Sequence, residues 1–385
     1  MWIGACVSTI GTWMQTQAQN WLVLEISGNP FYLGLDAFLG QIPIFLFTLV
    51  GGVVADRLDR RHVLMGSQVI QLTCAFTLAL LISYGKVHIW HILSLSFLVG
   101  TAQAFGGPAY SALIPTLVGK EDLPNAIALN SIQFNLARMI GPAIGLLAMT
   151  KISTAWCFYL NGFSYLAVIA TLIMARTSFT PKPSQTSVME SMKQGFGFIR
   201  GQSAMGSLIV LAFLMTMLGI PVLTFLPVFA RDIFKQGPDG YTMLLEVAGG
   251  GSIVGALLVA TFHHMSHKGR LAMVNLMVLG VCVIGFSFST NRLVSYGLLF
   301  VGSAALISVF ALINSLVQTI TTDEMRGRVM SVYNMAFRGG MPFGSLVSGK
   351  FVKDFGAPVV VAVNGFLLIM LALWFMPARK KVTEL

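Results

Sequence analysis

The sequence predicts an all-α membrane protein, with twelve transmembrane helices in two pseudo-symmetric six-helix bundles. Composition points to this fold class, because 56% of the residues are hydrophobic, 10% are charged and the mean hydropathy is +0.80, far from the norm of soluble domains. Apolar runs of about 20 to 28 residues recur, each long enough to cross a hydrocarbon core about 30 Å thick. Equivalent residues also recur in the two halves of the chain.

Each apolar run is expected to be a helix, because lipid does not tolerate unpaired backbone groups and the runs are too long for barrel strands. The expected spans are residues 2–24, 31–55, 63–83, 88–117, 123–149, 154–175, 206–230, 240–262, 270–289, 292–319, 327–351 and 357–377.

The longest polar interval, residues 175–202, divides these spans six and six. It contains Pro181 and Pro183 in a Ser/Thr-rich stretch, followed by an amphipathic segment. The expected domains are an N-terminal bundle of residues 1–175, a cytoplasmic linker of 176–205, a C-terminal bundle of 206–377 and a cytoplasmic tail of 378–385.

The two halves share residues at similar offsets. A shift of 200 positions places Arg138 on Arg338, and a shift of 203 places Asn161–Phe163 on Asn364–Phe366. The common order favours a duplicated six-helix unit, with a substrate site between the halves near the middle of the membrane.

Lysine and arginine in the loops predict the orientation, since positive residues are retained on the cytoplasmic side. Placing the loop at residues 56–62 in the cytoplasm puts most of the loop lysines and arginines there. We therefore expect a multi-pass protein of the cell inner (plasma) membrane with both termini cytoplasmic. The net charge of +10 follows from this bias, so no nucleic-acid partner is expected. The first span begins at Met1 without a cytoplasmic lead, which leaves an upstream N-terminal segment open.

No cofactor or metal site is expected, and no enzymatic activity. The four cysteines are scattered singly through apolar spans, without metal or redox spacing. The run at residues 344–351 resembles a phosphate-binding loop, but Phe351 stands where the magnesium-binding Ser or Thr is required. His263 and His267 share one helical face without a nearby acid, which does not favour a metal site.

One short stretch concentrates charge behind two glycines: GGVVADRLDRRH, residues 51–62. It resembles the cytoplasmic loop signature of the major facilitator superfamily, and the twelve-helix count and the division into six and six agree with that family. The signature residues here are Gly52, Asp56, Arg57, Arg60 and Arg61. One departure is Asp59, which replaces the usual second glycine.

The resemblance implies alternating access, with a latch in which Asp56 interacts with the amides at the start of another helix. The candidate receiver is residues 321–329, where Thr321 and Glu324 have capping-box spacing. The repeat counterpart of the signature has Met265 in place of Asp56, so a latch would be asymmetric. The alternative is that the charges only anchor the loop on the cytoplasmic side.

Residues 137–147, ARMIGPAIGLL, resemble the antiporter motif of the exporting branches, although Ala137 and Leu146 replace two of its glycines. The motif members present are Gly141, Pro142 and Gly145. Gly251 and Gly255 are expected to pack against this small-residue face, in an interface that prevents leak. An ordinary kinked helix would explain the same residues.

Residues 11–35 and 104–131 resemble the bacterial group that includes macrolide efflux proteins and the enterobactin exporter. This resemblance implies proton-coupled export of small amphipathic molecules, drug-like or siderophore-like, with protons, substrate and the lipid bilayer as partners of a monomer. The fourth span lacks the arginine of many drug antiporters, and Gln103 lies in that region. The alternatives are a facilitator or importer of a metabolite without proton antiport, and a membrane receptor or scaffold that transports nothing.

Ionisable residues within spans are costly and are functional candidates. Asp36 and Glu246 lie at nearly equivalent repeat positions, and a carboxyl group in such a place can load and release a proton; snorkelling to the interface is the alternative. Arg138 and Arg338 lie deeper and are expected to face a cavity or to form internal ion pairs.

The first span carries a polar stripe. Ser8, Thr12, Gln15 and Gln19 are spaced by four, three and four residues, which places them on one helical face. We expect Thr12, Gln15 and Gln19, together with Gln103, to line the cavity; hydrogen bonding between helices would explain the same stripe.

Overall fold

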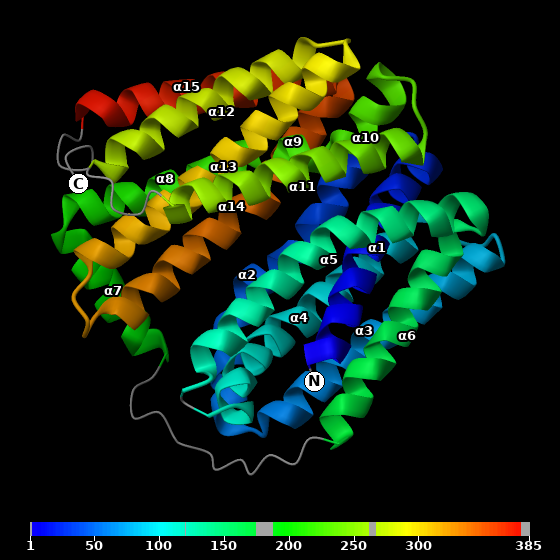
Figure 1. The fold of residues 1–385 in the computed structure, drawn as a ribbon, viewed down its shortest axis with the longest axis horizontal. Coiled ribbons are helices and arrows are strands. Elements are labelled where there is room, and N and C mark those ends of the chain that lie inside the picture. The colour runs from blue at the N-terminus through cyan, green and yellow to red at the C-terminus, as the bar shows by residue number, and fades with distance from the viewer. Residues whose placement is uncertain (1, 120, 175–187, 262–266, 379–385) are drawn as a thin grey trace. The chain divides into compact units, whose positions relative to one another are not determined.

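A computed structural model describes residues 2–119, 121–174, 188–261 and 267–378, which form helices joined by short loops (Figure 1). The first half contains α1 (Trp2–Ser27), α2 (Phe31–Arg57), α3 (Arg60–Ser83), α4 (Ile89–Leu117), α5 (Leu123–Lys151) and α6 (Thr154–Met174). The second half contains α7 (Val188–Gly201), α8 (Ser203–Gly219), α9 (Pro221–Thr224), α10 (Leu226–Val228), the π-helix η1 (Phe229–Ile233), α11 (Pro238–Thr261), α12 (Lys268–Phe288), α13 (Arg292–Ile320), α14 (Arg326–Phe355) and α15 (Ala357–Ala378).

Every expected span corresponds to a helical segment, and the all-α membrane fold is confirmed. Within the described residues, ten segments are long and apolar enough to cross a membrane. The remaining two of the expected spans, α1 and α14, are long enough but more polar. The reason lies in their sequences, since α1 carries three glutamines and α14 carries five arginines and lysines.

The seventh span is a chain of short helical pieces rather than one helix. Pro221 and Pro227 fall inside it, and each proline lacks the amide hydrogen that would continue the helical ladder. The segment therefore passes from α8 through α9 and α10 into η1. The span expected at residues 206–230 is in the correct position, but its interruptions were not predicted.

The chain divides into two compact units. One comprises Met1–Gly28 with Leu35–Gln185, and the other comprises Asn29–Gly34 with Thr186–Leu385. In the first unit α1 packs against α5 and α6, and α3 packs against α4 and α6. In the second unit α8 packs against α14, and α12 packs against α13 and α15. Corresponding helices thus make corresponding pairs, as a duplicated unit predicts.

Glycines produce close helix crossings in both units. A Cβ atom on Gly51 of α2 would lie 2.1 Å from the carbonyl oxygen of Ala104 on α4. In the second unit a Cβ on Gly251 of α11 would lie 2.1 Å from the carbonyl oxygen of Phe300 on α13. Small residues allow such backbone contact between membrane helices, so the α2–α4 and α11–α13 pairs have the same crossing.

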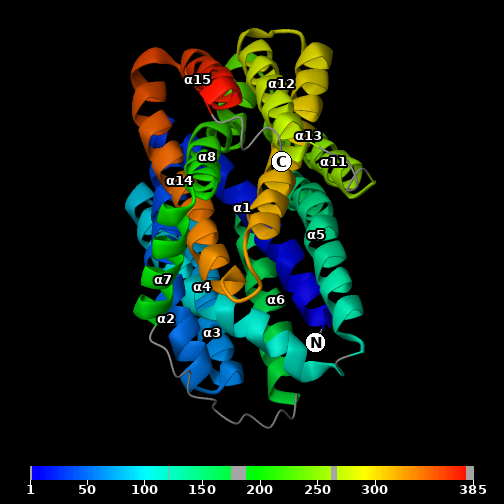
Figure 2. The same ribbon diagram turned by 90° about the vertical axis from the view of Figure 1, so that its left-hand side faces the viewer.

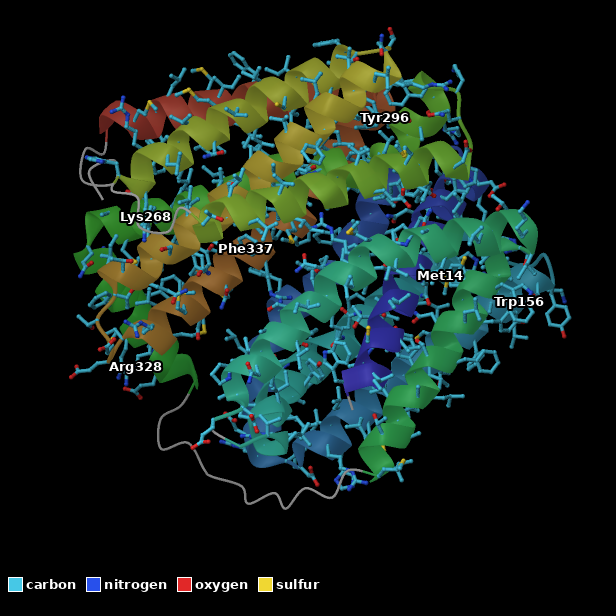
Figure 3. All side chains as sticks on the ribbon, viewed as in Figure 1. Met14, Trp156, Lys268, Tyr296, Arg328 and Phe337 are labelled. Carbon is cyan, nitrogen blue, oxygen red and sulfur yellow. The ribbon has the colours of Figure 1, made fainter. Side chains whose placement is uncertain are left out.

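The amphipathic segment expected in the linker forms α7, which packs against α14 of the second unit (Figures 1 and 2). Gly195 faces the α14 backbone, where a Cβ would lie 2.9 Å from the carbonyl oxygen of Arg328. Arg328 is labelled at the lower end of α14 in Figure 3. Ile199, one turn further along α7, is buried. Part of the expected linker is therefore a packed helix.

Neighbouring glycines should respond differently to alanine. Gly51→Ala would force a methyl group into the Ala104 carbonyl, and overpacking of this kind costs about 1–3 kcal/mol. A Cβ on Gly52 meets no atom within 4 Å, so Gly52→Ala should be neutral or gain up to about 1 kcal/mol from helix propensity. Thermal unfolding in detergent measures both variants, and equal midpoints would contradict the close α2–α4 crossing.

Candidate functional site

Asp36 lies at the centre of a buried hydrogen-bonded cluster in the first unit. Its carboxylate, 5% exposed, accepts hydrogen bonds from Gln19 Nε2 at 2.8 Å and from Ser96 Oγ at 2.5 Å. Gln19 Nε2 also donates to Ser96 Oγ at 2.9 Å. The cluster joins α1, α2 and α4, so Asp36 faces the interior of its unit and does not snorkel to the interface.

The chemistry of this cluster follows from its partners. Both groups that donate to Asp36 are neutral, and none of the ion pairs found among the described residues includes this carboxylate. A buried carboxylate held only by neutral donors remains costly in a low-dielectric interior. Binding a proton removes the charge while leaving oxygens that can still accept hydrogen bonds. Both hydrogen bonds could therefore persist when the carboxyl group binds a proton.

A second polar network surrounds the hydroxyl of Tyr165 on α6. This oxygen lies 3.5 Å from Thr12 Oγ1, accepts from Asn161 Nδ2 at 3.2 Å, and lies 3.4 Å from Gln71 Oε1. Asn161 Nδ2 also donates to Gln15 Oε1 at 2.7 Å. Three helices, α1, α3 and α6, thus meet through side-chain amides and hydroxyls.

Gln103 joins the same network from α4. Its Nε2 donates to Gln71 Oε1 at 3.4 Å, and Gln71 Nε2 donates to Ser67 Oγ at 3.1 Å. The sequence reading included Thr12, Gln15 and Gln103 but missed Gln71 and Tyr165. A signal for Gln71 was available, because a glutamine in the middle of an apolar span needs a partner. Thr12, Gln15 and Gln19 of the polar stripe in the first span form hydrogen bonds with other helices. Such interhelical bonds were the alternative to a role in lining the cavity.

The two intramembrane arginines have different surroundings. Arg138 on α5 is half-buried, and its guanidinium carbon lies 5.8 Å from the centre of the Trp13 ring on α1, within the range of a cation–π interaction. Arg338 on α14 is exposed, and the described part of the chain offers it no hydrogen bond or ion pair. Their equivalent positions in the repeat therefore do not give them equivalent chemistry.

Glu246, the repeat counterpart of Asp36, also differs from it. It is half-buried on α11 and has no hydrogen-bond or ion-pair partner among the residues that the structure describes. The two candidate acids therefore do not form a matched pair.

The charged loop between α2 and α3 is built around Asp59. Its side chain caps α3 by accepting a hydrogen bond from the backbone nitrogen of Arg61 at 2.9 Å, and it contacts His62 Nδ1 at 3.1 Å. Aspartate is among the preferred residues at a helix N-cap. The departure from the family glycine at this position therefore has a local purpose, which is to begin α3.

Two arginines of the signature tie the loop to other helices of the first unit. Arg60 donates to the carbonyl of Ala112 on α4 at 2.9 Å, and Arg61 donates to the carbonyl of Ile173 in the last turn of α6 at 2.8 Å. Cations are favourable at helix C-termini, where carbonyls lack partners. Asp56 lies 3.7 Å from Arg60, with its side chain 52% exposed. Arg57 is also exposed.

The capping box expected at Thr321 and Glu324 is wrong. Thr321 follows the end of α13, and its hydroxyl donates back to the carbonyl of Val317 at 2.5 Å. Helix α14 begins only at Arg326. The buried hydroxyl of Thr321 thus finds its partner in the preceding helix, which spacing along the sequence does not reveal.

The glycines of α5 and those of α11 each pack against a helix of their own unit, and the expected pairing of the two sets stays a prediction. A Cβ on Gly141 would lie 2.6 Å from Trp13 Cβ, and one on Gly145 would lie 3.2 Å from Cγ of Met14, a buried α1 residue (Figure 3). Gly251 packs against α13, as described above. Pro142 is buried beside Gly141.

The α1–α5 contact has a counterpart in the second unit. A Cβ on Gly340 of α14 would lie 2.3 Å from the carbonyl oxygen of Phe213 on α8, and one on Gly344 would lie 2.0 Å from that of Met217. The glycines of the antiporter-like motif therefore belong to a helix crossing that both units share.

Within the described residues no cluster of three or more His, Cys, Asp or Glu side chains could hold a metal ion. Cys74, Cys157 and Cys282 are buried. His263 and Met265 lie outside the described residues.

Comparison with known proteins decides the family. A family model described as a transmembrane secretion effector matches residues 1–384. The chain belongs to this major facilitator family. It is thus a multi-pass membrane transporter of small molecules and not an enzyme, and the resemblance inferred from the loop signature is confirmed.

Relatives of this chain include proteins named for the efflux, transport or export of different substrates. It is 22% identical to macrolide efflux protein A of Streptococcus pyogenes over 97% of this chain and 93% of that protein. It is 23% identical to the staphyloferrin A transporter of Staphylococcus aureus, over 97% of this chain and 94% of that protein. It is 24% identical to the enterobactin exporter EntS of Escherichia coli, over 89% of this chain and 82% of that protein.

A solved structure supports the fold. The crystal structure of the nucleoside transporter NupG is similar with a TM-score of 0.75 at 14% sequence identity, covering 97% of this chain and 98% of that one. The major facilitator fold expected from the sequence is therefore confirmed.

The cap at Asp59 gives a stability prediction. Asp59→Ala removes the acceptor for the Arg61 amide and should lower the free energy of unfolding by about 1 kcal/mol. Asp59→Ser, the matched control, keeps an acceptor oxygen and should stay close to the original protein. Chemical denaturation in detergent compares the variants, and an Asp59→Ala protein as stable as Asp59→Ser would contradict the capping role.

Proposed function

We propose that this transporter exports small amphipathic molecules, drug-like or siderophore-like, across the bacterial inner membrane, and that the proton gradient drives the export. Asp36 is the group that binds and releases the proton. The observation that carries this proposal is the burial of Asp36 against two neutral donors, Gln19 and Ser96. The named relatives, which handle a macrolide and two siderophores, support an exporter of this substrate class.

Proton exchange at Asp36 has a structural consequence. Gln19 lies on the same face of α1 as Thr12 and Gln15, which belong to the network around Tyr165. When Asp36 binds a proton, the acceptor of the Gln19 hydrogen bond changes from a charged to a neutral carboxyl group. Because Gln19 is on the same helix as Thr12 and Gln15, a shift of α1 would carry this change to the network around Tyr165. Thr12, Gln15 and Gln103 form the polar part of the proposed substrate cavity in the first unit, where Arg138 adds positive charge. Arg338 is the cavity candidate of the second unit.

The remaining assignments complete the proposal. Glu246 is a second, weaker candidate for proton coupling, because its half-buried position lacks the enclosing hydrogen bonds of Asp36. Asp56 is the acid of a cytoplasmic latch that favours one state of the cycle. Both termini lie in the cytoplasm, and the transporter works as a monomer.

Neutralising Asp36 should uncouple transport from the proton gradient. In Asp36→Asn the side chain keeps its shape and one acceptor oxygen but cannot cycle between charged and neutral forms. We expect gradient-driven efflux to fall roughly 5- to 150-fold, the usual range of coupling between sites, with substrate binding little changed. Proteoliposome flux with and without a pH gradient measures the effect, for a macrolide and a catecholate siderophore.

Two variants control this experiment. Asp354→Asn removes an exposed acid at the end of α14 and should leave efflux unchanged. Glu246→Gln should reduce coupling less than Asp36→Asn does. Full pH dependence of efflux in Asp36→Asn would refute the proton role of Asp36, and equilibration of substrate without concentration in the unmodified protein would identify a facilitator instead.

The latch makes a separate prediction. Asp56→Asn should change the rate of transport while leaving stability nearly unchanged, because the exposed pair of Asp56 with Arg60 is worth at most about 1 kcal/mol. Asp59→Asn keeps the helix cap and serves as the matched control on the same loop. Flux and thermal unfolding are compared for both variants. If Asp56 is only part of a positive-inside anchor, neither substitution will alter flux.

A further inference from the structure

A groove of about 640 Å³ lies in the second unit between α7, the start of α8 and the end of α15. In Figure 1 α7, the start of α8 and the end of α15 lie on the left-hand side of that unit. The groove is separate from the polar networks around Asp36 and Tyr165, which belong to the first unit. Transport as proposed above does not use it.

One wall of the groove is apolar and exposed. Phe196 of α7 is 47% exposed, Val210 of α8 is 48% exposed, and Trp374 of α15 is 58% exposed. Gly206 keeps the wall open, because a Cβ there would approach no atom closer than 3.9 Å. An open apolar channel of this kind suits a hydrocarbon chain.

The groove lining also includes polar and positively charged groups. Arg200, in the last turn of α7, lines the groove and is exposed. In the described part of the chain it forms no hydrogen bond or ion pair. Gln202 follows it and precedes α8, whose first turn has no side-chain cap. An anion beside Arg200 would therefore meet a free guanidinium and an amide donor.

We propose that this groove binds one anionic phospholipid, with the phosphate beside Arg200 and an acyl chain along Phe196, Val210 and Trp374. Charge and shape both favour this occupant, because the lining combines a cationic group, Arg200, with exposed apolar side chains. Tryptophan is enriched where membrane helices meet the headgroup region, and basic pockets between transmembrane helices bind anionic headgroups. The amphipathic α7 is suited to the same interface.

The lipid would connect elements that are distant in the sequence. It would contact α7, α8 and α15 at once, and so hold the helix that precedes the second bundle against the end of the chain's last helix. The proposal is independent of the transported substrate and of proton coupling.

The test measures binding of palmitoyl-oleoyl phosphatidylglycerol and of the matching phosphatidylcholine to the detergent-purified full chain, by native mass spectrometry and by thermal unfolding. The anionic lipid should bind more tightly and raise the unfolding temperature more. Arg200→Gln should weaken binding of phosphatidylglycerol roughly fivefold, the effect of one arginine near an anionic headgroup. Binding of phosphatidylcholine should change little.

Two further variants assign the effect to the groove. Arg270→Gln removes another exposed arginine of the second unit that does not line the groove, and it should leave lipid binding unchanged. Gly206→Phe fills the apolar channel and should weaken binding of both lipids. The unfolding temperature without added lipid reports whether each variant is folded.

Three results would overturn the proposal. They are equal binding of the two lipids by the unmodified protein, an equal loss in Arg200→Gln and Arg270→Gln, and binding of glycerol phosphate as tight as that of phosphatidylglycerol. The last result would identify a soluble anion site rather than a lipid site.

Discussion

A buried polar group inside a transmembrane span finds no partner in lipid, and this constraint organises the interior of the first unit. Several threonines satisfy it locally by donating to the carbonyl four residues earlier, as Thr16 and Thr101 do. Larger side chains need a neighbouring helix. The two networks around Asp36 and Tyr165 are the outcome, and they draw α1, α2, α3, α4 and α6 together in one unit.

Much of the fold could be predicted because length and hydropathy are properties of a single segment. The twelve expected spans match helical segments, with ends that differ by a few residues where polar groups decide the boundary, as Asp59 does for α3. Contacts between segments could not be predicted in the same way. Spacing placed Gly141 and Gly145 on one face, but it did not show that α1 fills that face, nor that Thr321 bonds backwards to Val317.

The candidate site was predicted in part for the same reason. Asp36 and Gln19 stood out because each is polar within an apolar span, and the structure joins them. Gln71 and Tyr165 were missed. A tyrosine in an apolar span cannot be told from an ordinary apolar side chain until the partners of its hydroxyl are known, and Gln71 is one of these partners. The repeat gave Glu246 and Asp36 equivalent positions, but it did not show that their surroundings differ. Each unit has the same kinds of helix crossing. The buried hydrogen-bonded networks around Asp36 and Tyr165 both lie in the first unit.

The interrupted seventh span sets the second unit apart from the first in its mechanics. Its counterpart α1 is one unbroken helix, whereas here two prolines and a π-helix follow one another before Ile233. In a π-helix each backbone hydrogen bond spans one more residue than in an α-helix. Conversion of that turn between the two windings would rotate everything beyond it by about 100°, the angle of one residue. The interruption therefore gives this segment a place where its winding can change, which the unbroken α1 lacks.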